Sequence, residues 1–364
     1  MKNKIDHRMH ADVSRTPWVS FCIATYRRPE ILKKTLNDIK QQSFTDFEVI
    51  VSDNDPAQSS RSIVEEINDK RFLYFSNSEN VGMVRNFNIS LKNARGDFIV
   101  MIADDDPPRD YFLQTMRNLW QDHPNYGAYF GACEVVIACE EAAAAYQVNM
   151  GSIKFLADAP ENAIRCYSRE QYPKAFLEGK VFPYTLWSTG IVRRDIAVSV
   201  GGMPDFGSPL LTDLSYISVV GSFAGCATIN KVVGGQVIHG GNSGMVDPHN
   251  VEIALTGSHK YIEKMLSSRQ DWVNLKGSVE KFLAKYIANH CVAMGVYFKN
   301  KGCKEEIEEL KSTLVRISDL PGMGKIRIYY FKSIIIGNIK KILWFLIPTY
   351  KWVRGLLYRS GLLT

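Results

Sequence analysis

The stretch FIVMIADDD, residues Phe98–Asp106, places three consecutive aspartates directly behind six apolar residues. The apolar run predicts a buried strand, because it is short, rich in β-branched residues and followed by Pro107 and Pro108. Three like charges at one strand end repel each other and are costly to desolvate without partners. A divalent cation removes that cost, since carboxylates are natural ligands of Mg²⁺ and Mn²⁺. The alternative is an acidic turn that caps the following helix.

The residues before this strand alternate between strand and helix patterns. Four apolar runs have the length of strands: 19–24, 47–52, 72–75 and 98–103. Three amphipathic segments lie between them, the last with Asn80 placed to cap it: 30–42, 59–68 and 81–94. This order predicts an α/β fold with a doubly wound parallel sheet. Ligands bind at the carboxyl ends of such strands, where the three aspartates lie.

From about residue 126 the pattern becomes mixed. We expect a long strand at 128–138, an irregular excursion at 140–168, a strand-like stretch at 185–192 and a helix starting at Asp195. Further on we expect a helix at 211–223, strand pieces within 227–238 interrupted by Gly234-Gly235, and a mostly helical region at 251–317. The parallel sheet is therefore expected to continue into a mixed region and then into helices.

Composition and charge limit the class of protein. A chain of 364 residues with 46% hydrophobic content is long enough for two or more domains. Its seven scattered cysteines contain no C-x-x-C pair, so reduced thiols are expected instead of a zinc ribbon or a disulfide framework. Eight basic residues and no acidic one follow Asp319. Since the whole chain has a net charge of +6, the part before this segment carries −2. A nucleic-acid-binding body is therefore not expected.

The loops after the first two strands are polar but not rich in glycine. Neither G-x-G-x-x-G nor a Walker A loop is present, which argues against a nicotinamide dinucleotide fold and a P-loop. A flat base could stack near Tyr26, while Asp53 accepts an N–H from a pyrimidine edge. Both residues are expected on the same rim as the aspartates.

Five short motifs occur in order: Thr25–Pro29, Val51–Asn54, Asn80–Gly82 with Arg85-Asn86, Gly96-Asp97 and Asp104–Asp106. Together they resemble family 2 glycosyltransferases, strongly over residues 18–122 and more weakly to about residue 245. The resemblance implies the GT-A fold, an inverting transfer from a nucleotide sugar, and Mn²⁺ or Mg²⁺ as cofactor.

The resemblance also implies roles for particular residues. Donor-binding residues would be Thr25, Tyr26, Arg28, Asp53, Arg85, Asp104 and Asp105. Metal ligands would be Asp106, Asp104 and His239, the last of which precedes Gly240–Ser243. Many members carry Asp where this chain has Ala103, so the sharing of roles among the three aspartates stays open. A packed turn aromatic for Tyr26 and a surface helix arginine for Arg85 are the structural alternatives.

Three downstream residues complete the expected site. Asp213 matches the catalytic base that takes the proton of the acceptor hydroxyl, although Thr212 stands where relatives usually carry Glu. A helix-capping aspartate is the alternative. Trp187 and Thr189 lie in a segment that resembles the acceptor side, and a core tryptophan is an equally good account of Trp187.

The basic C-terminal segment, 321–364, interleaves lysine and arginine with aromatic residues. Its longest apolar run, Ile342–Ile347, is far shorter than the roughly 20 residues that span a bilayer. The pattern predicts a helix lying in the interface of an anionic membrane. An ordinary packing helix with a solvated basic face is the alternative.

These observations predict four segments: a flexible leader at 1–17, a GT-A domain at 18–245, a helical region at 246–320 and the membrane-associating segment. The expected protein is peripheral on the cytoplasmic face of the cell membrane. It would transfer a sugar, with a UDP-sugar favoured as donor, to a polyprenyl-diphosphate-linked saccharide in surface polysaccharide (O-antigen) synthesis. A sugar-phosphate nucleotidyltransferase and a non-catalytic membrane-attached scaffold remain as alternatives.

Overall fold

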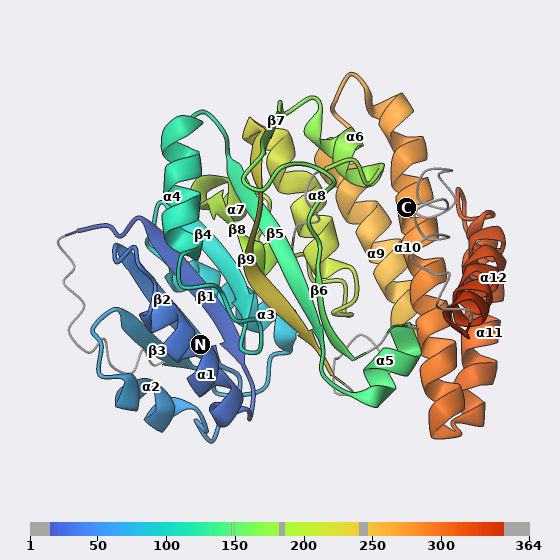
Figure 1. The fold of residues 1–364 in the computed structure, drawn as a ribbon, viewed down its shortest axis with the longest axis horizontal. Coiled ribbons are helices and arrows are strands. Elements are labelled where there is room, and N and C mark those ends of the chain that lie inside the picture. Colours follow the sequence, from blue (N-terminus) through green and yellow to red (C-terminus); the bar gives the residue numbers. More distant parts are fainter. Residues whose placement is uncertain (1–14, 147, 149, 182–185, 240–246, 346–364) are drawn as a thin grey trace.

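The computed structural model describes residues 15–146, 148, 150–181, 186–239 and 247–345. A single twisted sheet carries helices on both faces, and a layer of long helices packs beside it, at the right of Figure 1. The strand order in the sheet is β3-β2-β1-β4-β8-β5-β9-β7, with β6 paired to β5. This arrangement confirms the expected α/β class.

The first four strands are parallel, as predicted. They are β1 (Val19–Thr25), β2 (Phe47–Asp53), β3 (Phe72–Ser76) and β4 (Phe98–Ala103). The helices between them are α1 (Pro29–Lys40), α2 (Arg61–Ile67) and α3 (Met83–Asn93). The register pairs Thr25 with Asp53 and Ala24 with Ala103, so these strands end level with one another. Their carboxyl ends form one rim.

The prediction that Asn80 caps the third helix is wrong. Gly82 occupies the N-cap position of α3 with φ of 86°, a conformation that glycine adopts without a Cβ clash. The Asn80 side chain instead accepts a 2.9 Å hydrogen bond from the backbone N–H of Gly82. The asparagine therefore shapes the turn before the helix.

The second part of the sheet is mixed. It contains β5 (Ala128–Ile137), β6 (Gly151–Lys154), β7 (Ile164–Tyr167), β8 (Gly190–Arg193) and β9 (Cys226–Ile238). The predicted irregular excursion is wrong, since it contains β6, β7 and α5 (Glu140–Tyr146). The strand-like stretch is only partly confirmed, because a 3₁₀ turn, Trp187–Thr189, precedes β8.

The predicted break within residues 227–238 is also wrong. β9 is one strand of 13 residues, and Gly234 and Gly235 pair with Cys133 and Glu134 of β5. A register irregularity between Gly131 and Cys133 absorbs the unpaired residues. Ladder pairing uses backbone groups, so the two glycines do not interrupt it.

Side-chain alternation along the strands gives the sheet two apolar faces. Cys22, Met101 and Phe130 face α3 and α8 (Thr212–Ala224), whereas Phe21 and Val100 face α1 and α4 (Phe112–Asp122). Two short helices flank the first face: α6 (Tyr172–Leu177) and α7 (Arg194–Ser199). The helix predicted to start at Asp195 is confirmed within one residue.

The expected helical region is confirmed as a stack of helices. It contains α9 (His249–Leu266), α10 (Trp272–Lys301), α11 (Lys304–Ser318) and α12 (Ile326–Phe345). The buried residues of α10 join the same core as the α8 face of the sheet. No helix in the described part of the chain is long and apolar enough to cross a membrane. All seven cysteines are free.

Candidate active site

The rim of the parallel sheet brings the first loop and the aspartates together. The hydroxyl of Thr25, the last residue of β1, donates a 2.8 Å hydrogen bond to Oδ2 of Asp104. The hydroxyl of Thr35 on α1 donates a 2.7 Å bond to the backbone oxygen of Asp104. These two bonds fix the chain at the point where β4 ends.

Arg28 joins two of the three aspartates. Its Nε donates to Oδ2 of Asp104 at 3.2 Å, its Nη2 pairs with Oδ1 of the same residue, and its Nη1 donates to Asp105 at 2.9 Å. Asp104 is fully buried, and burial raises the pKa of its carboxyl to about 6 although Arg28 and Thr25 oppose the rise. The guanidinium thus supplies the positive charge that this cluster requires.

Asp106 is also buried, on the side of the cluster that faces β9. It is 4% exposed, and burial, followed by the charge of Asp105, raises the pKa of its carboxyl well above the ordinary value. A hydrogen bond from the backbone of Val237 on β9 opposes the rise. This carboxylate is therefore held behind the rim, between β4 and β9.

His239 meets the cluster from the end of β9. Its Nε2 lies 3.2 Å from Oδ2 of Asp105, and about 29% of its side chain is exposed. The contact brings together two residues that the sequence predicts for one site. The rest of the predicted loop, Gly240–Ser243, lies outside the described residues.

The two predicted base-binding residues differ in their surroundings. The Tyr26 ring is 37% exposed, with the guanidinium of Arg27 at 5.0 Å from its centre. Asp53 is fully buried, and its carboxylate accepts hydrogen bonds from the Tyr74 hydroxyl at 2.8 Å and from the backbone of Asp55 and Ser60, each at 3.0 Å. Asp53 thus holds the loop after β2, and its contact with a base stays a prediction.

Arg85 lies on the first turn of α3, at the same rim. Its side chain is 71% exposed and pairs with Asp205 at 2.8 Å. Asp205 belongs to the loop that leads to α8. The pair therefore connects the donor side of the rim to the segment that carries Asp213, and a role of Arg85 in phosphate or base binding stays a prediction.

Asp213 lies in the first turn of α8. This helix ends at Ala224 and passes through Gly225 directly into β9, which is parallel to β5. The helix consequently runs back along the sheet, and its first turn lies at the edge where the parallel strands end. The Asp213 side chain is partly exposed, and burial raises the pKa of its carboxyl.

The residue before this helix adopts an unusual backbone conformation. Leu211 has φ of 68° and ψ of −1°, in the left-handed region that leucine rarely occupies. Such strain costs of order 1–3 kcal/mol and persists where the surrounding structure determines it. It places Thr212 and Asp213 at the start of the helix.

The predicted acceptor-side residues are buried. Trp187 is 9% exposed and packs edge-on against Phe87, with ring centres 4.6 Å apart. The Thr189 hydroxyl lies within hydrogen-bond distance of the backbone oxygens of Leu186 and Gly131. Both residues support the sheet in this structure, and their contact with an acceptor stays a prediction.

A network of asparagines under the rim is not predicted by the sequence analysis. Asn86 on α3 donates to the backbone oxygens of Ser52 and Thr25 and accepts from Asn77. Asn54 accepts from Asn77 at 3.1 Å. The only signal in the sequence is the placement of these amides at strand ends, where backbone groups need partners.

The chemistry of the rim fits a divalent cation bound together with a ligand. Within the described residues, no group of three or more His, Cys, Asp or Glu side chains is arranged to hold a metal ion. Asp105 and His239 nevertheless present a carboxylate oxygen and an imidazole nitrogen side by side. Mg²⁺ commonly takes one or two carboxylates and completes its shell with water and substrate phosphates.

One family model matches the N-terminal part of the chain. The model for glycosyl transferase family 2 matches residues 20–149, which contain β1 to β4 and the three aspartates. This part of the chain is therefore similar to glycosyl transferase family 2. The resemblance stated from the motifs is thereby confirmed.

Two curated relatives are enzymes of saccharide assembly. The chain is 32% identical over 120 residues to the GalNAc(5)-diNAcBac-PP-undecaprenol beta-1,3-glucosyltransferase of Campylobacter jejuni. It is 38% identical over 93 residues to the abequosyltransferase RfbV of Salmonella typhimurium. The matches cover 32% and 24% of this chain and 38% and 28% of those relatives, so the chain spans about a third of their length.

A solved structure shares the fold of this chain. TarS of Staphylococcus aureus, in complex with UDP-GlcNAc, superposes with a TM-score of 0.51 at 14% identity. The match covers 81% of this chain and 90% of that chain. The likeness confirms the expected GT-A fold.

Proposed function

We propose that the protein is an inverting glycosyltransferase that moves a sugar from a nucleotide-sugar donor to a hydroxyl of a saccharide acceptor. The observation that supports this proposal most strongly is the convergence of Thr25, Arg28, Asp105 and His239 at the rim of the family 2 domain. The open end of a doubly wound sheet is where a nucleotide ligand binds.

The donor occupies the rim between the loops after β1, β2 and β4. The exposed ring of Tyr26 offers a stacking surface for the base. The guanidinium of Arg28 can exchange its contacts with Asp104 and Asp105 for contacts with diphosphate oxygens, since guanidinium groups bind phosphate and carboxylate with the same fork geometry. A UDP-sugar is the favoured donor.

Asp213 is the proposed general base. In an inverting transfer the acceptor hydroxyl attacks the anomeric carbon on the face opposite to the departing nucleoside diphosphate. The carboxylate takes the hydroxyl proton as the new glycosidic bond forms. Burial raises the pKa of this carboxyl, which increases its basicity relative to an exposed aspartate.

Asp106, Asp104 and His239 are the residues proposed to hold Mn²⁺ or Mg²⁺, with Asp105 adjoining them. A bound cation of this kind would neutralise the charge that develops on the diphosphate. Arg28 would contribute a second positive charge to the same oxygens. The protein residues keep these groups in place through the Thr25–Asp104 and Val237–Asp106 hydrogen bonds.

We propose a polyprenyl-diphosphate-linked saccharide as the acceptor, presented at the cytoplasmic face of an anionic membrane. One relative is named for a transfer to an undecaprenyl-diphosphate-linked saccharide. In this chain the support comes from α12, which lies at the outer side of the helical layer (Figure 1).

One face of α12 packs on the protein and the opposite face is apolar and exposed. Ile326 is fully buried, whereas Ile328, Phe331 and Ile335 are exposed by 64%, 63% and 57%. These three residues, named here the α12 stripe, recur at helical spacing on one side. Lys325 and Lys332 lie three and four positions from Ile328, which places positive charge beside the stripe. This combination suits a helix lying on an anionic membrane.

Calorimetric titration of the protein with UDP, GDP and dTDP, with and without Mn²⁺, tests the proposal. We expect at least one nucleoside diphosphate to bind more tightly with Mn²⁺ present. The corresponding sugar nucleotides would then be assayed for transfer to lipid-linked saccharides. A protein that binds none of the three nucleotides would not be a transferase of this kind.

A further inference from the structure

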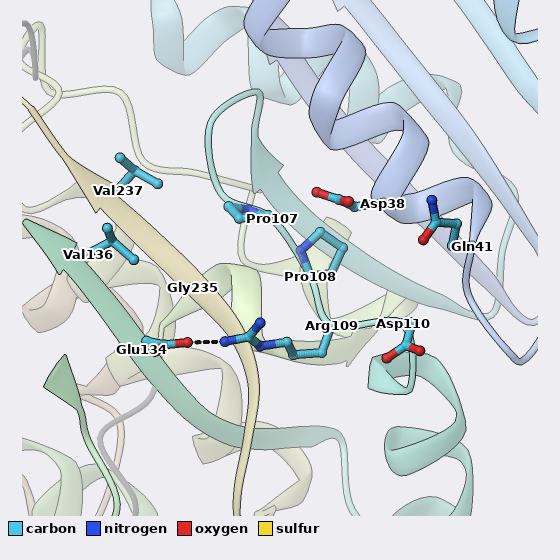
Figure 2. A pocket seen from close by; sticks show the side chains of 10 residues that line it. All are labelled: Asp38, Gln41, Pro107, Pro108, Arg109, Asp110, Glu134, Val136, Gly235 and Val237. Atoms are coloured by element: carbon cyan, nitrogen blue, oxygen red, sulfur yellow. Dashed lines mark hydrogen bonds and ion pairs between the residues drawn. The ribbon is translucent and has the colours of Figure 1, made fainter. Parts of the chain in front are cut away.

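A cavity of about 270 Å³ opens beside the rim, and nothing in the proposed transfer reaction occupies it (Figure 2). Its walls are the end of α1, the turn after the three aspartates and the middle of β5 and β9. Pro107, which follows Asp106, and Val237, which precedes His239 by two positions, form the wall nearest to the rim.

The cavity lies on the face of the sheet opposite to the catalytic base. Glu134 and Val136 line it from β5. The alternate residues of that strand, Cys133 and Val135, belong to the core that faces α8. Since side chains alternate along a strand, the cavity and Asp213 lie on opposite sides of the sheet.

Two polar side chains of α1 are available to a ligand. In Figure 2 the Asp38 carboxyl group points from α1 toward the turn formed by Pro107 and Pro108. Among the described residues, neither Asp38 nor Gln41 has a hydrogen bond or ion pair through its side chain. Both side chains therefore offer unused hydrogen-bonding groups to this cavity.

The opposite wall is rigid and charged. Arg109 pairs with Glu134 (Figure 2). Glu134 also accepts a hydrogen bond from the hydroxyl of Ser152 on β6. The Arg109 backbone oxygen accepts a 2.6 Å bond from Gln42. These bonds hold the guanidinium and the carboxylate in fixed positions, so the cavity has a preformed polar wall.

The chemistry of the walls selects a class of ligand. Three carboxylates, those of Asp38, Asp110 and Glu134, line the cavity against one cation, Arg109, so the cavity disfavours phosphates and other anions. The proline rings, together with Val136 and Val237, give apolar surface next to hydrogen-bonding groups. A neutral ring with hydroxyl groups matches both properties, and the volume accommodates about one ring.

We propose that this cavity binds one sugar ring of the acceptor saccharide, at a unit away from the hydroxyl that receives the new sugar. The inference depends on the proposed function in naming the acceptor. Carboxylates bind sugar hydroxyls by accepting their hydrogen bonds, and Asp38 has free lone pairs for this purpose. A saccharide held here would remain bound to the enzyme on the side of the sheet remote from Asp213.

Ligand-detected saturation-transfer NMR on the full chain without donor tests this proposal. The probes are a set of methyl glycosides and methyl N-acetylglycosides and their disaccharides. We expect saturation transfer from at least one probe to the wild type. Asp38→Asn should weaken its binding at least about tenfold, since the side chain loses its charge and one of its two acceptor oxygens. Val136→Phe, which fills the cavity, should abolish it.

The matched control is Asp122→Asn, which removes an exposed carboxylate at the end of α4 and should bind the probe like the wild type. Circular dichroism checks that each variant is folded. The proposal is overturned if no glycoside shows saturation transfer, if Asp38→Asn or Val136→Phe binds normally, or if UDP displaces the sugar. Calorimetry with UDP is run in parallel, so loss of nucleotide binding would count against the proposed function alone.

Discussion

Nε2 of His239 lies 3.2 Å from Oδ2 of Asp105, and this contact joins the ends of β9 and β4. The two residues are far apart in the sequence, and their strands are separated in the sheet by β8 and β5. The contact therefore closes the rim on the side where we propose that the donor diphosphate binds.

We expect His239→Ala to weaken Mn²⁺-dependent binding of UDP while leaving metal-independent binding unchanged. The reason is that the imidazole is one of the few protein ligands available to a cation at this rim. Calorimetric titration with and without Mn²⁺ measures the effect. His249→Ala, which alters an exposed histidine at the start of α9, is the control. Equal affinities of His239→Ala and wild type with Mn²⁺ would remove His239 from the metal site.

The metal-free protein should lose stability as the pH rises from about 4 to about 6. Asp104 has a folded-state pKa of about 6, above the ordinary value of 3.8, so the folded protein binds this proton more tightly than the unfolded chain. Its stabilising effect is complete below pH 4 and is lost as the pH passes through 6.

Asp104→Asn should remove this part of the pH dependence and make the metal-free protein more stable at pH 7, by up to about 3 kcal/mol. Urea denaturation in the presence of EDTA at several pH values measures the free energy of unfolding. Asp122→Asn should follow the wild-type curve. Parallel curves for Asp104→Asn and wild type would show that the carboxyl of Asp104 titrates normally.

Asp213→Asn should lower turnover by about 10² to 10⁴, the usual contribution of a positioned general base, without weakening donor binding. Turnover of the wild type should rise with pH through the raised pKa of this carboxyl. Asp195→Asn alters an acidic residue in the first turn of another helix, α7, and should retain activity. A collapse of donor affinity in Asp213→Asn would mean that the residue supports the helix terminus.

Substitution of Ile328, Phe331 and Ile335 by serine should reduce binding to vesicles that contain phosphatidylglycerol. The substitutions remove apolar area from the α12 stripe. Because these three side chains are exposed, their replacement should leave the buried core intact. Sedimentation with vesicles measures the binding, and pure phosphatidylcholine vesicles report the electrostatic share. Val273→Ser, another highly exposed apolar position, is the control. Undiminished binding would place the membrane contact elsewhere.

Deletion of the whole segment 321–364 is a less suitable test of membrane binding. Met323 and Ile326 are buried against the helical layer, and their removal would open the core. The serine variants leave that packing in place.

The parallel half of the sheet could be predicted from sequence because its strands are short apolar runs with clear ends. Phe98–Ala103 begins and ends where the pattern predicts. The mixed half of the sheet is harder to predict from sequence. Gly234 and Gly235 have no side chain and so contribute to no hydrophobic pattern, although their backbone continues the ladder. Periodicity records side chains, whereas strand pairing depends on backbone groups.

The sequence predicts that the candidate residues share one rim and predicts only part of their contacts, and their roles stay predictions. The sequence places Arg28, Asp104 and His239 at chain positions that share a rim, and the structure brings them together. The sequence does not predict that Arg28 pairs with two aspartates, nor that the Asp53 carboxylate is bound by Tyr74 and by the backbone of its own loop. Those partners come from other strands, so only the tertiary arrangement determines them.

The direct passage from α8 through Gly225 into β9 has a consequence for protein engineering. The proposed base, Asp213, opens this helix–strand unit and His239 follows its end, so both belong to one contiguous segment. Chimeras exchanged at Leu211 and His239 would therefore transplant both groups from one parent as a pair. A chimera would therefore receive Asp213, the proposed base, and His239, a proposed metal ligand, from the same parent. The loops after β1 and β2 could be exchanged separately.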